Sequence, residues 1–84
     1  MNESVDWRDT LYAKSFDKEL RGLERRRNHD PSLTPKDLEK VLDALYIMDG
    51  ADMDGRLVVQ GINMAASIAA YEHFIAQWKA ERRS

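Results

Sequence analysis

The stretch from Leu57 to Trp78, LVVQGINMAASIAAYEHFIAQW, decides the fold that we expect for this 84-residue chain. It holds a single charged residue, Glu72, and no proline. It is rich in alanine, the residue with the highest helix propensity, and it is too long for a strand. We therefore predict a helix from about Arg56 to Glu81, roughly 39 Å long at 1.5 Å per residue.

This predicted helix is apolar on more than one side. On a helical wheel, one arc carries the large side chains Leu57, Met64, Ile68, Tyr71, Phe74, Ile75 and Trp78. A second arc carries Val58, Ile62, Ala65, Ala66, Ala69, Ala76 and Ala80. A helix that is apolar nearly all round is expected to be buried nearly all round. Either the second arc binds another copy or another protein's helix, or the helix packs between the two others with its alanines half exposed.

Two further helices precede this stretch. The first is predicted from about Ser4 to Asn28, with the apolar stripe Val5, Tyr12, Phe16, Leu20 and Leu23, and the first eight residues are expected to fray. The second begins after the N-cap Thr34, with Pro35 in its first turn, and ends at Asp49-Gly50. Its stripe is Leu38, Val41, Leu42, Leu45 and Met48.

The predicted fold is therefore all-α, a single domain over residues 1–84 with three helices in the order long, short, long. We expect the first and third helices to be the main packing pair. A chain of this size buries only about 60% of its unfolded surface, which favours a dimer.

Trp7 and Leu11 form an i, i+4 pair off the main stripe of the first helix. They add to the predicted interface Val58, Ile62, Ala65, Ala69 and Ala76, because tryptophan often anchors interfaces. The alternative is that the start of the helix folds Trp7 over the edge of the core.

Composition excludes several classes of protein. The chain has no cysteine, which rules out a disulfide scaffold and a thiolate metal site. No signal peptide is visible, and no apolar run reaches the 20 or so residues needed to cross a bilayer, so we expect a cytoplasmic protein that does not enter membranes.

The formal net charge of −2 conceals a separation of charge along the chain. Residues 14–27 hold six basic and three acidic side chains, net +3, whereas residues 28–55 hold two and seven, net −5. The cluster Arg21, Arg25, Arg26 and Arg27 could bind nucleic acid in a dimer. If the long helices run antiparallel, one chain does not bring this cluster beside Lys79, Arg82 and Arg83. The apolar third helix fits poorly as a recognition helix.

Motifs of catalysis and metal binding are missing. Asp52, Asp54 and Gly55 match the middle of an EF-hand loop, but Gly50 and Gly61 stand where its anchoring Asp and Glu are needed. The segment with Asp49, Asp52 and Asp54 is therefore interpreted as a turn. The two histidines have no partner at metal-ligand spacing, and phosphate-binding and nucleophile motifs are absent.

From the sequence we thus expect no catalytic residue, no metal and no cofactor. The predicted function is a small cytoplasmic protein–protein interaction module, a homo-oligomeric adaptor or regulator, with a homodimer as its expected state. Nucleic-acid binding through the arginine cluster is the alternative.

Overall fold

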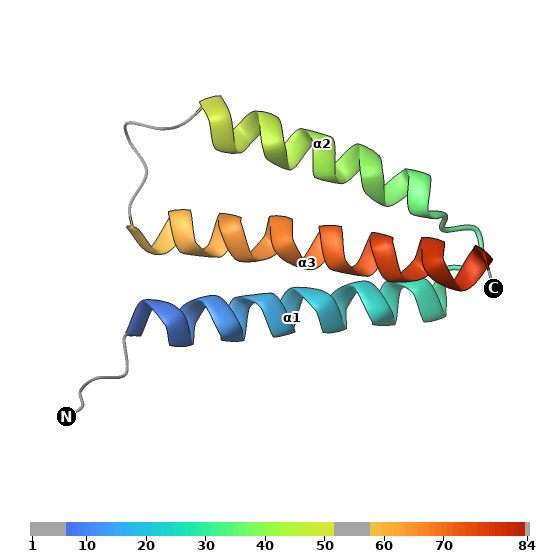
Figure 1. Cartoon of the computed structure of the whole chain (residues 1–84), viewed down its shortest axis with the longest axis horizontal. Helices are drawn as coiled ribbons and strands as arrows, with labels where there is room; N and C mark the ends of the chain where they lie inside the picture. Colours follow the sequence, from blue (N-terminus) through green and yellow to red (C-terminus); the bar gives the residue numbers. More distant parts are fainter. Residues whose placement is uncertain (1–6, 52–57, 84) are drawn as a thin grey trace.

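The computed structural model describes residues 7–51 and 58–83, which form three helices in the predicted order. α1 spans Trp7–His29, α2 spans Pro35–Ala51 and α3 spans Val58–Arg83. α3 lies between the other two helices (Figure 1), and it packs most closely against α1. The all-α fold and the predicted main packing pair are confirmed.

The two long helices run parallel. α2 runs back along α3, so α1 and α3 point the same way (Figure 1). We call the end where α1 and α3 finish and α2 begins the closed end, and the opposite end the open end. The condition considered from the sequence, that the long helices run antiparallel, is not met, because α2 runs back and α3 then returns to the direction of α1.

The hydrophobic core lies toward the closed end. Leu38 has no exposed surface, and α3 buries the four aromatic or branched side chains Tyr71, Phe74, Ile75 and Trp78 against it. The other buried members of this cluster are Leu23, Leu33 and Leu42. Leu33 precedes α2, so the connection between α1 and α2 is itself anchored in the core.

α3 lies in the middle of a single layer of three helices, and the helices do not form a triangular bundle in which each contacts both others. α1 and α2, both of which the structure describes, do not contact each other through their backbones. Ala66 and Ala70 of α3 are fully buried, and such small side chains permit close approach of a neighbouring helix backbone. α3 thus packs against both other helices within one chain, with Ala65, Ala76 and Ala80 exposed, and binding of a second copy to these alanines stays a prediction.

The start of α2 follows the predicted capping pattern. Thr34 Oγ1 accepts a hydrogen bond from the Asp37 backbone N–H at 3.3 Å, and Asp37 Oδ2 accepts one from the Thr34 N–H at 2.9 Å. Each side chain thus satisfies a backbone donor that the first helical turn leaves unpaired. The Thr34 N–H and the Thr34 hydroxyl, which lies 3.1 Å from Asp37 Oδ2, both donate to the Asp37 carboxylate and hold its pKa below the ordinary value of 3.8.

This cap makes the stability of the fold sensitive to acid. The folded-state pKa of Asp37 is lowered. The stability that the ionised Asp37 carboxylate contributes is therefore present above the unfolded pKa of about 3.9 and is lost as the pH falls through the folded-state pKa. We expect Asp37→Asn to lower the urea midpoint at pH 6 and to differ less from the natural chain at pH 2. Equal differences at both pH values would contradict an ionised cap. Asp43→Asn, the same substitution at an exposed carboxylate further along α2, is the control.

Helix boundaries differ from the prediction at two places. α2 continues through Gly50 to Ala51, and no described glycine has a positive φ, so Gly50 is not the left-handed residue that we expected to end the helix. α1 begins at Trp7, so Trp7 and Arg8 of the segment expected to fray are helical. The rest of that segment, residues 1–6, lies outside the described residues.

Candidate interaction surfaces

Large apolar side chains are exposed at the open end. α1 begins there, α2 ends there and α3 begins there (Figure 1). Seven side chains in the halves of the three helices nearer this end are between 38% and 71% exposed: Trp7, Tyr12, Tyr46, Ile47, Met48, Val58 and Val59. We call these seven residues the open-end cluster. They are all the large hydrophobic side chains that count as exposed in the described part of the chain.

The predicted interface residues lie on two parts of the surface. Trp7 is 53% exposed and Val58 is 60% exposed, so both belong to the open-end cluster. Ala65 and Ala76 are exposed along α3, whereas Ile62, Ala69 and Leu11 are half-buried. The structure therefore places Trp7 outside the buried core, with the Arg8 guanidinium 5.8 Å from the centre of its ring.

The sequence interpretation missed five members of the open-end cluster as surface residues. Tyr46, Ile47 and Val59 were not assigned to any surface, and Tyr12 and Met48 were wrongly placed on packed stripes. A signal was available in the run Tyr46-Ile47-Met48, because three successive side chains span 200° of a helix and cannot all face one partner. Tyr46 is held in place by a hydrogen bond from its hydroxyl to Glu72 Oε2, which raises its pKa above the usual 10.0.

The arginine cluster lies at the closed end and is partly paired. Arg21 Nε contacts Asp17 at 2.9 Å within α1. Arg27 reaches across to α3, where its Nη2 donates to Glu81 at 3.0 Å and its guanidinium carbon lies 4.1 Å from the centre of the Trp78 ring. Arg25 and Arg26 are exposed.

The parallel helices bring the arginine cluster to the same end as the basic residues of α3 within one chain. Lys79 forms an ion pair with Glu39 of α2, and Arg82 is exposed. The side chain of Arg83 lies outside the described residues. The condition for separating the two basic groups, antiparallel long helices, is not met, and acidic side chains contact Arg21, Arg27 and Lys79 of this basic region.

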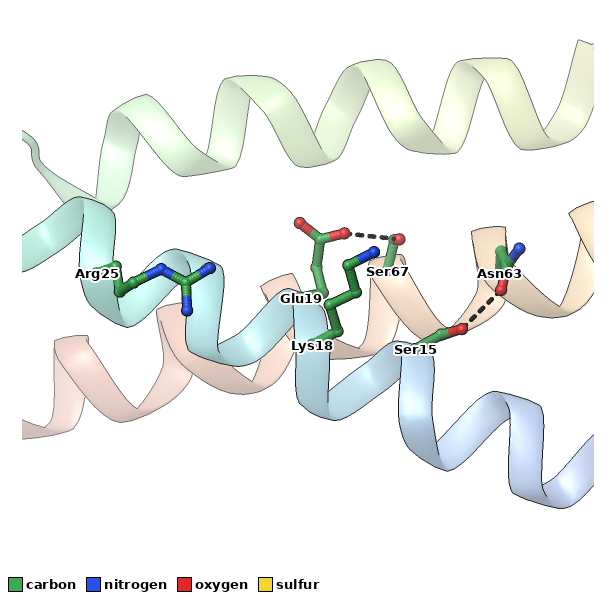
Figure 2. Close-up of a pocket in the computed structure, with 7 residues that line it drawn as sticks. Ser15, Lys18, Glu19, Arg25, Asn63 and Ser67 are labelled. Atoms are coloured by element: carbon green, nitrogen blue, oxygen red, sulfur yellow. Dashed lines mark hydrogen bonds between the residues drawn. The ribbon is translucent and has the colours of Figure 1, made fainter.

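A polar pocket of about 380 Å³ lies between α1 and α3 (Figure 2). Its lining residues are Ser15, Lys18, Glu19, Gly22, Arg25, Asn63 and Ser67. Figure 2 shows Ser15 Oγ donating to Asn63 Oδ1 at 2.6 Å and Ser67 Oγ donating to Glu19 Oε1 at 3.0 Å. The two bonds lie one helical turn apart on both α1 and α3, so they join successive turns of the two parallel helices. The pocket therefore lies along the contact between α1 and α3, where Ser15 and Asn63, and Glu19 and Ser67, are hydrogen-bonded to each other.

No metal centre is formed by the part of the chain that the structure describes. Residues 7–51 and 58–83 contain no group of three histidine or acidic side chains arranged to hold an ion. His29 Nδ1 lies 2.8 Å from the Arg25 carbonyl oxygen, and the His73 ring packs 5.9 Å from Phe16. Asp52 and Asp54 of the predicted turn lie outside the described residues.

Two further results concern membrane insertion and similarity to known proteins. None of α1, α2 and α3 combines the length and apolar character that crossing a bilayer requires. No protein-family model, curated protein or solved structure matches this chain.

Proposed function

We propose that this protein is a small cytoplasmic interaction module, a homo-oligomeric adaptor or regulator that acts by binding protein and has no catalytic activity of its own. One observation carries the proposal: the large exposed apolar side chains lie in the halves of the helices nearer the open end, while the core lies toward the closed end. Apolar patches of several hundred Å² on small proteins mark interaction sites. An exposed tryptophan, Trp7, supplies the type of side chain that anchors such contacts.

Site-specific photocrosslinking in cells that produce the protein tests this proposal. A benzophenone side chain replaces Ile47 at the open end or, as the control, Lys36 at the closed end of the same helix. Both positions are exposed, so neither replacement disturbs packing. We expect discrete protein adducts from position 47 and none from position 36. Equal adduct patterns, or none at position 47, would remove the open end as an interaction surface.

Nucleic-acid binding is the second proposal, and the parallel arrangement of α1 and α3 favours it. It places Arg25 and Arg26 at the same end as Arg82 without the need for a second chain. Binding through phosphates would weaken steeply with salt. A mobility shift at low salt that Arg25→Ala with Arg26→Ala abolishes would support this function, and no shift at low salt would exclude it. Lys14→Ala, on the same helix toward the open end, is the control.

A further inference from the structure

The pocket between α1 and α3 is lined by two cations, Lys18 and Arg25, which come from the same helix. Neither the Lys18 ammonium nor the Arg25 guanidinium forms an ion pair or a hydrogen bond with any other residue that the structure describes. Arg21, which lies between them in the sequence but does not line the pocket, is paired with Asp17. Two cations that face one pocket without a partner raise its affinity for an anion.

Gly22 leaves space between these two cations. Lys18, Gly22 and Arg25 stand at positions i, i+4 and i+7, so they share one face of α1, with the Cα atoms of the cations about 10 Å apart along its axis. Glycine is a poor helix former, and Gly22 has no positive φ that would require it. Outside its own helix backbone, a Cβ atom at this position would meet only Arg25 Nη2, at 3.9 Å. Arg25 thus folds back over Gly22 toward Lys18 (Figure 2), and an anion has room between the two cations.

The pocket also holds a carboxylate that can accept a further hydrogen bond. Glu19 Oε1 accepts from Ser67, and Glu19 Oε2 has no donor within the described part of the chain. Asn63 Oδ1 accepts from Ser15, which leaves the two protons of Asn63 Nδ2 available as donors. With two cations and one carboxylate, the lining side chains carry a net charge of +1. A ligand that matches them has an anionic group for the cations and hydroxyl groups that donate to Glu19.

From this arrangement we propose that the pocket between α1 and α3 binds a small phosphate monoester that carries hydroxyl groups. The three free oxygens of a phosphate point in different directions, so Lys18 and Arg25 can bind them from opposite ends, whereas a planar carboxylate suits one arginine. The hydroxyl groups donate to Glu19. A volume of about 380 Å³ is within the range of pockets that hold small molecules. The inference goes beyond the proposed function, since it adds a small ligand to a protein that binds protein.

Titration of the natural chain with glycerol 3-phosphate, followed by amide NMR, tests the site. We expect saturable shifts at Gly22, at Ser67 and at the side-chain amide of Asn63. Lys18→Gln should raise the dissociation constant about tenfold, because it removes a charge-assisted hydrogen bond. Lys14→Gln removes the same charge one turn away, outside the pocket, and should leave the constant unchanged. No saturable shift up to about 10 mM, or equal weakening by both variants, would overturn the proposal.

Gly22→Leu separates the pocket from the charge around it. The variant keeps every cation and has a higher helix propensity, but its side chain fills the space between Lys18 and Arg25. We expect binding of glycerol 3-phosphate to be lost while the urea midpoint does not fall. Unchanged binding would place the phosphate outside the pocket and would overturn the proposal.

Glu19→Gln tests the hydroxyl groups of the ligand. The amide oxygen can still accept from Ser67, but the carboxylate that binds hydroxyl groups is lost. We expect the natural chain to bind glycerol 3-phosphate more tightly than inorganic phosphate, and this preference to fall about fivefold in the variant. Inorganic phosphate itself should bind the variant more tightly, because a neighbouring negative charge is gone. A preference that Glu19→Gln leaves unchanged, or a natural chain without any preference, would overturn the assignment of a ligand with hydroxyl groups.

Discussion

Replacing Leu38 by alanine is expected to lower the free energy of unfolding by about 3 kcal/mol, within the range for truncating a buried leucine. Leu38 is the largest fully buried side chain, and it lies where α2 meets α3. A domain of this length has a total stability of roughly 4–13 kcal/mol, so the loss is a large share. Urea unfolding followed by circular dichroism measures it.

Lys40→Ala is the matched control for this prediction. Lys40 is exposed two residues further along the same helix, and alanine preserves helix propensity. We expect its unfolding free energy to stay within about 0.5 kcal/mol of the natural chain. If the two variants were equally destabilised, the core would not lie where α2 packs on α3.

The second large effect is expected at Trp78, with a loss of about 4 kcal/mol for Trp78→Ala. The ring is 9% exposed, meets Phe74 edge-on at 5.9 Å and carries the Arg27 guanidinium on its face. The substitution removes a large buried side chain and the cation–π contact that ties α1 to the end of α3. Thermal and urea unfolding measure the change in stability.

The two tryptophans form a natural comparison for this prediction. Trp7→Phe should change the unfolding free energy by less than about 0.5 kcal/mol, because Trp7 is half exposed. The same variant leaves Trp78 as the single tryptophan, and its fluorescence should show a buried ring. If Trp78→Ala does not fold, Trp78→Phe keeps an aromatic ring in the site and is expected to fold with a smaller loss. A solvent-exposed spectrum in Trp7→Phe would refute the packing.

The sequence predicts the closed end well because local signals and packing agree there. Thr34 and Pro35 mark the start of α2 through backbone chemistry that operates within one turn. The stripe that includes Leu38 and Leu42 meets the large arc of α3, and both are buried. At these positions the apolar periodicity and the available partner surface coincide.

The open end could not be predicted from periodicity. A stripe shows which face of a helix is apolar, but it does not show how far along its length a partner follows. α2 lies further from α3 toward the open end (Figure 1), so Met48 is exposed although it continues the stripe of Leu38 and Leu45. The candidate surface arises from this divergence.

The relative direction of the two long helices could have been predicted from the length of the connection between α1 and α2. The five residues between α1 and α2, Asp30 to Thr34, span at most about 17 Å, less than the roughly 25 Å length of α2. They cannot cross the length of the bundle, so α2 must start where α1 ends. A similar return before α3 makes the first and third helices parallel.

The parallel pairing of α1 with α3 also determines the order in which the molecule can assemble. The hydrogen bonds Ser15–Asn63 and Arg27–Glu81 between these helices join residues 48 and 54 positions apart. By contrast, Tyr46 of α2 meets Glu72 of α3 only 26 positions away. Closing shorter loops first costs less chain entropy, so we expect the hairpin of α2 and α3 to form before α1 docks. During synthesis, the first helix to leave the ribosome must therefore wait, unpaired, for the last turns of the chain.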